Sequence, residues 1–293
     1  MVKVMTDLTF SLSDVTLEAR SWGDPSSPLA LLLHGFPDTA DTFRFLGPHL
    51  AERGYYAVAP FMRGYAPSSV SLTNNYQLAA LANDANRIHE LLGANESAVL
   101  IGHDWGAAAT YPALSAEPSR WRRGITMAVP PIAVTGNAFM TFSQLQSSWY
   151  MFFFQNALAD VVVPLNDYDF INQLWAQWSP GYEANEDLAR VKASLLAPEN
   201  LAAALGYYRA MFGRSELIDP SLRHVQDAML GVPPMPVLYL HGENDGCFKV
   251  SSLSDPTDYL SEGSIFDVVP ATGHFLHLED PERVHEAIDR FLS

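Results

Sequence analysis

The feature that most constrains the fold is a series of short apolar runs, each followed by polar or glycine-rich sequence. Apolar runs of this length are typical of strands whose two faces are both buried, as in a parallel β-sheet. We therefore expect a mainly parallel sheet that is covered on both faces. The runs are Leu29–Leu33, Tyr56–Ala59, Ala98–Ile101, Ile125–Val129, Val237–Leu240 and Ile265–Val269.

Helical patterns separate several of these runs. Residues Gln77–Leu92 place leucine, isoleucine and alanine side chains at near-helical spacing, and Ala107–Glu117 and Arg283–Leu292 show a similar pattern. Strands that alternate with helices are typical of an α/β fold. The sequence has no internal repeat, and its 293 residues suit one large α/β unit with room for an insertion.

The alternation of strands and helices breaks down between Pro130 and about Asp219, where the sequence is aromatic and helix-like. Because the strand pattern resumes afterwards, we interpret this stretch as a helical cap inserted into the α/β unit. The predicted boundaries are residues 1–130 and 221–293 for the core and 131–220 for the cap. Composition alone leaves open the alternative that these helices belong to an ordinary core.

The charge balance and the cysteine count restrict the partners and the location. The chain has 17 Lys and Arg residues against 33 Asp and Glu residues, a formal net charge of −16. This argues against nucleic acid or anionic membranes as partners, since phosphate groups are bound by clustered cations. Cys247 is the only cysteine, so the expected compartment is a reducing cytoplasm. We expect no secretory signal, and no apolar run reaches the roughly 20 residues that a bilayer span requires.

The most informative motif is Gly102-His103-Asp104-Trp105-Gly106, which lies between an apolar run and the start of a helical pattern. A small residue on each side of a central reactive residue is the nucleophile-elbow arrangement, in which a sharp turn lifts the central side chain above the sheet. Asp104 holds that position. A carboxylate can displace a leaving group at a saturated carbon, which produces an ester on the enzyme. The competing interpretation is that Asp104 is only the N-cap of the helix.

A second motif, His34-Gly35-Phe36-Pro37, ends the run Leu29–Leu33 in an abrupt turn. The backbone N–H groups of Phe36 and Trp105 are the predicted oxyanion hole for hydrolysis of an ester on Asp104. Glycine and proline after a strand are also ordinary turn residues, and without the elbow that simpler interpretation would be favoured.

Two further segments supply a candidate base and a candidate acid. His274 follows the run Ile265–Val269 on a loop, where an imidazole with a pKa near neutrality can activate water. Asp245 follows Val237–Leu240 and can orient that imidazole and stabilise its cation, with Glu243 as the competing acid. The chain order nucleophile, acid, histidine is the one expected when an elbow carries the nucleophile.

A histidine pair raises the question of a metal site. His277 lies three residues after His274, a spacing that could also suggest metal ligands. The chain has no carboxylate–histidine motif of the metalloprotease type, so we expect no metal and no cofactor. Most of the other histidines are expected at the surface.

Together these motifs resemble those of the α/β-hydrolase-fold epoxide hydrolases, from His34-Gly35-Phe36-Pro37 to Gly273-His274-Phe275, which is nearly the whole chain. Arg63-Gly64-Tyr65-Ala66-Pro67-Ser68 resembles the family's arginine–glycine–tyrosine loop, although Ala66 replaces the more usual glycine. The elbow motif is shared with haloalkane dehalogenases, so it is more specific for the mechanism than for the substrate.

The resemblance implies that a small-molecule epoxide and water are the substrates and that two cap tyrosines protonate the epoxide oxygen. Gly206-Tyr207-Tyr208-Arg209-Ala210 resembles the second tyrosine motif and gives this role to Tyr208, while Tyr207 is expected only to pack. Ser148-Trp149-Tyr150-Met151-Phe152 resembles the first motif and nominates Tyr150. A shifted register would place Phe153 there instead.

We expect an aromatic pocket between core and cap, with His34, Trp149, Phe153 and Phe275 among its lining residues. Such a pocket favours an apolar or aromatic epoxide. The sequence does not identify the epoxide, its regioselectivity or its enantioselectivity, and it does not decide between a monomer and a homodimer.

Two other functions stay open at this point. A haloalkane dehalogenase would use the same Asp104 nucleophile, with Trp105 and an asparagine or a second tryptophan binding the halide. Phe36 stands where many dehalogenases carry asparagine, but Trp149, Trp175 and Trp178 are available. A non-catalytic small-molecule-binding protein of the same fold is the alternative from another class, although such proteins generally keep serine at the elbow.

Overall fold

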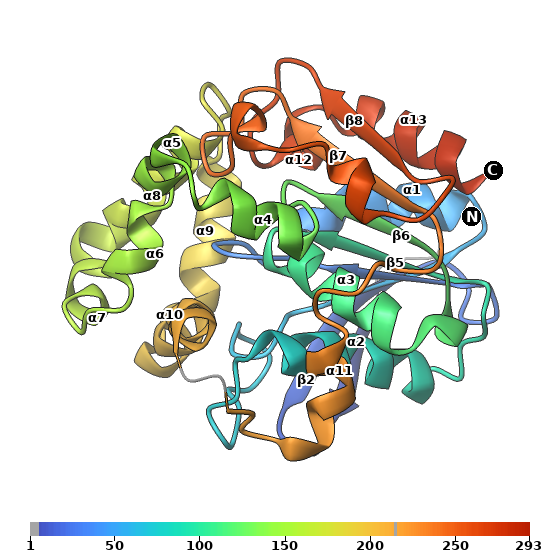
Figure 1. The fold of residues 1–293 in the computed structure, drawn as a ribbon. Helices are drawn as coiled ribbons and strands as arrows, with labels where there is room; N and C mark the ends of the chain where they lie inside the picture. The colour runs from blue at the N-terminus through green and yellow to red at the C-terminus, as the bar shows by residue number, and fades with distance from the viewer. Residues whose placement is uncertain (1–5, 214–215) are drawn as a thin grey trace.

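The structure is a computed structural model that describes residues 6–213 and 216–293, and its centre is an eight-stranded sheet (Figure 1). The strand order is β1-β2-β4-β3-β5-β6-β7-β8. β2 pairs antiparallel with β1 and β4, and all the other pairings are parallel, so the predicted mainly parallel α/β sheet is confirmed. The strands are β1 (Thr6–Ser11), β2 (Thr16–Trp22), β3 (Leu29–Leu33), β4 (Tyr56–Pro60), β5 (Ala98–His103), β6 (Trp121–Met127), β7 (Val237–Gly242) and β8 (Ile265–Val269).

The central strands are apolar throughout because both of their faces are covered. In β3, Leu29, Leu31 and Leu33 pack into one hydrophobic core, and Ala30 and Leu32 pack into a second core on the opposite face. Successive side chains of a strand point to opposite faces, so a strand between two helical layers must be apolar at every position. The helices of the first face are α2 (Leu78–Leu91), α3 (Trp105–Ala116) and α11 (Arg223–Asp227), and those of the second are α1 (Leu46–Glu52) and α13 (Pro281–Leu292).

Three strand predictions differ from the structure. Strands β1 and β2 were not predicted, because neither is an apolar run: β1 is an edge strand and only its Phe10 is buried, and in β2 partly buried residues alternate with buried ones. The edge strand β8 is buried on one face only, since Ile265 and Asp267 are exposed. β6 ends at Met127 and not at Val129, because Ala128 takes a positive φ of 66° and turns the chain out of the sheet.

Between β6 and α11 the described residues form helices and no strand, and we call α4 to α10 the helical segment. In Figure 1 α5 to α10 stand beside the sheet, at the left of the view. None of the described helices, in this segment or elsewhere, is both long and apolar enough to cross a membrane. The remaining helices are α4 (Ile132–Ala138), α5 (Phe142–Ser147), α6 (Trp149–Phe153), α7 (Ala159–Val162), α8 (Leu165–Trp178), α9 (Asn185–Ser194), α10 (Pro198–Phe212) and α12 (Leu276–Glu279), with short 3₁₀ turns at Ala40–Arg44, Pro118–Arg120, Pro220–Leu222, Val250–Ser252 and Pro256–Tyr259.

The loop after β4 fastens α10 to the core. The hydroxyl of Tyr207 donates to the carbonyl of Arg63 at 2.8 Å, and the amide of Asn200 donates to the carbonyl of Gly64 at 2.7 Å. A side chain at position 64 would meet the methyl group of Ala203 at 2.4 Å, so only glycine lets α10 approach this closely.

The Arg63 side chain holds this loop from the inside. Its guanidinium group is buried and donates to both carboxylate oxygens of Asp84 on α2, each at 2.7 Å, and to the carbonyl of Asn75 at 2.6 Å. A bidentate arginine–carboxylate pair combines charge with a fixed geometry. The pair therefore determines the position of the loop that α10 rests on.

Arg63→Ala is expected to lower the free energy of unfolding by about 3–5 kcal/mol, because it leaves the buried Asp84 carboxylate without its partner. Denaturant-induced unfolding would measure the loss. Arg87→Ala is the matched control, since the Arg87–Glu90 ion pair is exposed and its removal should cost less than about 1 kcal/mol. Equal losses in the two variants would contradict a structural role for the buried pair.

Candidate active site

The candidate residues meet at one edge of the sheet. Phe36 follows β3, Asp104 follows β5, Asp245 follows β7 and His274 follows β8. These strands are parallel, so their carboxyl ends lie at the same edge, where ligands of open α/β sheets bind. Glu243, the competing acid, is exposed and accepts a hydrogen bond from the backbone N–H of Ala271, whereas the hydrogen bond of His274 is to Asp245.

The backbone at Asp104 forms a strained elbow. Its φ and ψ angles are 51° and −116°, and a positive φ is unfavourable for a residue with a side chain. The turn is so tight that a Cβ atom on Gly102 would lie 2.2 Å from the carbonyl oxygen of Gly106. A Cβ atom on Gly106 would lie 2.0 Å from the carbonyl oxygen of Leu33. The two glycines of the motif are therefore required by contact, and the predicted elbow conformation is present.

One oxygen of the Asp104 carboxylate is fixed by the turn after β3. The backbone N–H of Phe36 donates to Oδ1 at 2.7 Å. Gly35 allows this approach, because a Cβ atom there would lie 2.3 Å from Oδ1 and 2.6 Å from the backbone nitrogen of Trp105. The two N–H groups of the predicted oxyanion hole thus lie on either side of Gly35, beside the carboxylate.

The second oxygen of Asp104 faces the imidazole of His274. The distance from Oδ2 to Nε2 is 3.5 Å, and Nε2 has no hydrogen-bond partner among the described residues. On the other side of the ring, Nδ1 donates to Asp245 Oδ2 at 2.9 Å. The backbone N–H groups of Cys247 and Phe248 donate to Asp245 Oδ1 at 2.7 and 2.9 Å. Asp245 is thereby held in one orientation, and it sets the tautomer of His274.

The buried charges act on one another. Burial alone would lower the pKa of His274, but the Asp245 and Asp104 carboxylates outweigh it and raise this pKa to about 10. Burial would raise the pKa of Asp245, but the His274 cation and the hydrogen bonds to the carboxylate lower it. The His274–Asp245 pair is therefore ionised at neutral pH while Asp104 carries its charge.

A carbonyl group of the helical segment holds both loops of this pair. The oxygen of Trp178, the last residue of α8, accepts hydrogen bonds from the backbone N–H groups of Gly246 at 3.2 Å and His274 at 3.0 Å. A Cβ atom on Gly273 would lie 2.5 Å from the same oxygen. The relative position of Asp245 and His274 thus depends on α8 as well as on the sheet.

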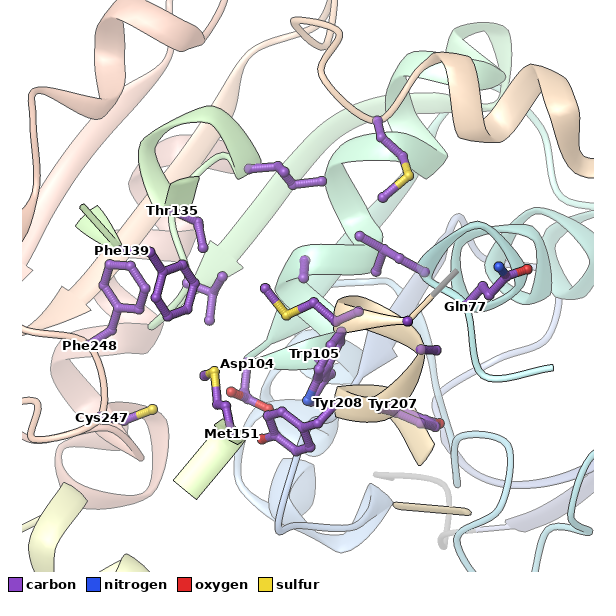
Figure 2. A pocket seen from close by; sticks show the side chains of 18 of the residues that line it. Gln77, Asp104, Trp105, Thr135, Phe139, Met151, Tyr207, Tyr208, Cys247 and Phe248 are labelled. Carbon is purple, nitrogen blue, oxygen red and sulfur yellow. The ribbon is translucent and has the colours of Figure 1, made fainter. Parts of the chain in front are cut away.

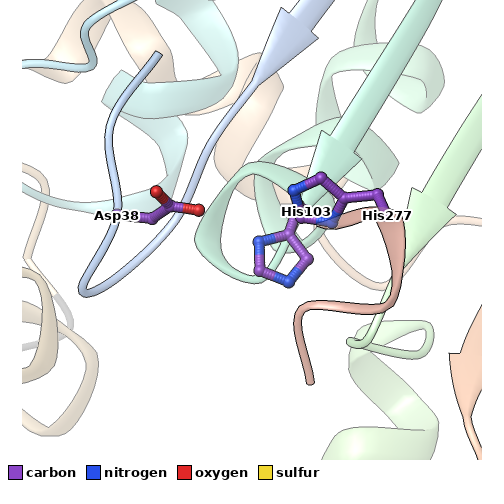
Figure 3. Close-up of side chains that lie close together, drawn as sticks. All are labelled: Asp38, His103 and His277. Carbon is purple, nitrogen blue, oxygen red and sulfur yellow. The ribbon is translucent and has the colours of Figure 1, made fainter. Parts of the chain in front are cut away.

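Asp38, His103 and His277 form a second group of buried polar residues (Figure 3). The ring of His103 lies 4.9 Å from that of His274, centroid to centroid. His103 Nε2 donates to the carbonyl of His274 at 2.9 Å, which leaves His103 Nδ1 as an unprotonated, unpartnered nitrogen. Burial lowers the pKa of His103 to about 3 and raises that of Asp38 to about 8, so both side chains are neutral at pH 7. His277 Nε2 bonds with the hydroxyl of Thr42 at 2.6 Å.

This group corrects the expectation for the histidines. The chain has eight histidines besides His274, and most of them are not at the surface. Five of the eight are buried: His34, His89, His103, His241 and His277. His241 bonds through Nε2 to the carbonyl of Phe248 at 2.7 Å, behind the Asp245 loop. Their position at the carboxyl end of a buried strand is the signal that could have identified His103, in β5, and His241, in β7, as buried.

The two nominated tyrosines lie next to each other above the carboxylate. Tyr208 on α10 and Tyr150 on α6 are buried, with ring centroids 5.6 Å apart. The Tyr208 hydroxyl makes no hydrogen bond with a described residue, whereas that of Tyr150 lies 3.4 Å from Cys247 Sγ. Burial and the Asp104 carboxylate raise the pKa of Tyr208 well above its usual value, so the hydroxyl keeps its proton. Tyr207 donates to Arg63, in line with its expected packing role.

A cavity of about 370 Å³ opens beside Asp104 (Figure 2). Asp104, Tyr208 and Cys247 lie at one side of it, and Gln77 lies across from them. The rest of the lining is mostly apolar and includes several flexible methionines. The lining residues are Gln77, Leu78, Asp104, Trp105, Ala108, Val129, Ile132, Thr135, Phe139, Met151, Tyr207, Tyr208, Ala210, Met211, Gly213, Gln226, Met229, Cys247 and Phe248.

None of the four residues predicted to line the pocket is among these. His34 is buried beneath the sheet edge, where its Nε2 accepts the backbone N–H of Met62 at 2.9 Å. Phe275 stacks on Trp175, with ring centroids 3.5 Å apart.

The other two residues lie on the outer side of α6. Trp149 and Phe153 both pack against Phe170, and Trp149 is 44% exposed. Phe153 is therefore directed away from Asp104, whereas Tyr150 on the same helix contacts Tyr208. The sequence motifs gave no indication that Cys247, Phe248, Phe139 and the methionines line the cavity.

Comparisons with known proteins agree with this geometry. The chain is 28% identical over 291 residues to epoxide hydrolase 1 of Caenorhabditis elegans, covering 96% of this chain and 69% of that protein. It is 28% identical over 280 residues to epoxide hydrolase 3 of Xenopus tropicalis, covering 92% and 73%. The crystal structure of epoxide hydrolase A from Mycobacterium thermoresistibile superposes with a TM-score of 0.79 at 22% identity, covering 99% and 98% of the two chains.

The family profile described as alpha/beta hydrolase fold matches residues 28–281, which span β3 to the start of α13 and include every candidate residue named above. The elbow between β5 and α3 and the order of acid and histidine after β7 and β8 are the features of that fold. The chain therefore belongs to the α/β-hydrolase fold family.

Proposed function

We propose that this protein is an epoxide hydrolase that converts an apolar or aromatic epoxide into a vicinal diol through an ester on Asp104. The observation that carries the proposal is the placement of two buried, protonated tyrosine hydroxyls beside a carboxylate that faces an apolar cavity. A carboxylate suits attack on a saturated carbon, and the tyrosines suit an oxygen leaving group, which needs a proton. The names of the relatives support the same reaction.

In the first step Asp104 Oδ2 attacks a ring carbon of the epoxide, because Oδ1 is held by the N–H of Phe36. The new bond joins Oδ2 to carbon while the ring C–O bond breaks. Tyr208, with Tyr150 beside it, donates the proton that the departing oxygen takes up. The product of this step is a hydroxyalkyl ester on Asp104 and a transient tyrosinate.

In the second step the Nε2 proton of His274 first passes through solvent to the tyrosinate. The neutral Nε2 then removes a proton from a water molecule, which attacks the carboxyl carbon of the ester. The backbone N–H groups of Phe36 and Trp105 stabilise the resulting oxyanion, and Asp245 stabilises the imidazolium. Collapse of the intermediate transfers the remaining water proton to the departing alkoxide and releases the diol, and His274 keeps the proton taken from water, which restores the resting imidazolium. Formation of the ester removes the Asp104 charge that helps to keep His274 protonated, so the base becomes available when it is needed.

Within this proposal, residues 131–220 form a cap over a core of residues 1–130 and 221–293, and the protein acts in the cytoplasm.

The dehalogenase alternative is less favoured, because Trp105 packs its ring against Tyr208 and Tyr207, and Trp149 lies outside the cavity. A binding protein without activity has no use for the unpartnered Nε2 of His274 beside Asp104.

The first test measures diol formation from a panel of aryl and alkyl epoxides. Wild type is expected to form diol and Asp104→Ala none, because the nucleophile is absent. His274→Gln should form the ester but not hydrolyse it, which intact-protein mass spectrometry detects as added mass equal to the epoxide. Halide release from haloalkanes without any diol formation would instead favour the dehalogenase.

A second test concerns the tyrosines. Tyr208→Phe is expected to lower kcat/KM for an epoxide by ~10²-fold or more, because it removes a positioned acid. Tyr207→Phe is the matched control: its hydroxyl bonds to the Arg63 carbonyl, so turnover should change little even if stability falls. Steady-state kinetics of both variants measure this. Loss of activity in both to the same extent would contradict a chemical role for Tyr208.

A third test follows the charge of His274. Since two carboxylates raise its pKa to about 10, Asp104→Asn should move that pKa toward neutrality while the burial penalty remains. NMR titration between pH 6 and 10 would measure the pKa of the His274 imidazole in both proteins. The wild-type ring is expected to stay protonated to a higher pH than the ring of the Asp104→Asn variant. An unchanged titration would show that Asp104 does not set the charge of the base.

A further inference from the structure

Cys247 lies in the candidate active site and has no part in the proposed reaction. It is buried, lines the cavity beside Asp104, and follows the acid Asp245 by two residues. Its sulfur contacts the hydroxyl of Tyr150 at 3.4 Å. A thiol is the softest ligand that a protein offers to a metal ion, so its neighbours decide whether it can take part in a metal site.

Two of those neighbours offer suitable ligand atoms. Asp104 Oδ2, His274 Nε2 and Cys247 Sγ lie within 4.8 Å of one another. The Oδ2–Nε2 distance is 3.5 Å, close to the separation of about 3.4 Å that two ligands take around tetrahedral zinc. Nε2 of His274 is buried, has no hydrogen-bond partner among the described residues and faces the carboxylate, so an ion can take the place of its proton between the two atoms.

The surroundings of these ligands also suit a metal ion. His274 donates through Nδ1 to Asp245, and a histidine whose second nitrogen is held by a carboxylate is the usual arrangement around protein-bound zinc. Two of the three ligands, Asp104 and Cys247, line the cavity, which gives an ion a path to the site and leaves a fourth position open to water.

We propose that Asp104, His274 and Cys247 bind one thiophilic divalent cation, such as Cd²⁺ or Zn²⁺, and that the bound ion blocks catalysis. On binding, the S–H bond of Cys247 and the Nε2–H bond of His274 break, sulfur–metal and nitrogen–metal bonds form, and both protons leave to solvent. The ion occupies Asp104 Oδ2 and His274 Nε2, the two atoms that the proposed nucleophile and base must use. The inhibition rests on the proposed function, whereas the binding does not. The three residues are far apart in the sequence, so no spacing motif could have indicated them.

The test titrates the full chain with Cd²⁺ and follows the sulfur-to-cadmium charge-transfer absorption. Because the chain has one cysteine, this signal reports Cys247 alone. Wild type is expected to saturate at one Cd²⁺ per chain, and Cys247→Ser and Cys247→Ala should show no such band. His274→Gln keeps the thiol but should need at least about tenfold more Cd²⁺ to saturate.

Turnover supplies the second measurement. Cd²⁺ should inhibit diol formation by wild type, a chelator should reverse this, and Cys247→Ser should need at least about tenfold more Cd²⁺ for half inhibition. Mg²⁺ at the same concentration should have no effect, since it prefers oxygen ligands.

Three results would overturn the proposal: no charge-transfer band in wild type, a band that saturates equally in His274→Gln, or equal inhibition of Cys247→Ser and wild type. If no epoxide is converted at all, the proposed function fails, and the charge-transfer titration still decides whether the ion binds.

Discussion

The close packing of two backbone turns, one after β3 and one after β5, is the constraint on which the site depends. Gly102 and Gly106 leave no room for a Cβ atom at the elbow, and Gly35 leaves none beside the carboxylate. This contact holds Asp104 in a conformation that an isolated chain would avoid. It also places the Phe36 N–H at hydrogen-bonding distance from the carboxylate. The strained backbone and this hydrogen bond together fix the orientation of the Asp104 side chain.

Three ionisable groups then share a volume from which water is largely excluded. Isolated charges would be costly there, but His274 lies between two carboxylates, and Asp245 receives two backbone N–H groups as well. The two carboxylates stabilise the His274 cation, and that cation in turn stabilises the Asp245 carboxylate. Any event that neutralises one of them changes the proton affinity of the others, which couples the state of position 104 to the state of position 274 without movement of the backbone.

The sequence predicted what depends on burial and on strand ends. β3 and β5 were evident because both of their faces are covered. β1 is mostly exposed and β2 alternates partly buried with buried residues, so neither has a continuous apolar run. The location of Asp104 follows from its place after a buried strand, although its catalytic role is still a proposal. The cavity lining could not be predicted, because it depends on which side of α6 faces the core. Trp149 and Tyr150 are adjacent in the sequence but lie on opposite sides of that helix.

The carbonyl of Trp178 has a consequence for how such proteins diversify. A single oxygen at the end of α8 holds the backbone of the loop that carries Asp245 and of the loop that carries His274. The helical segment is therefore part of the scaffold that aligns these two side chains. Exchange of this segment for one from a relative would preserve the alignment only if the new segment placed a carbonyl group at the same point, so recombination between lineages is constrained at the C-terminal end of α8.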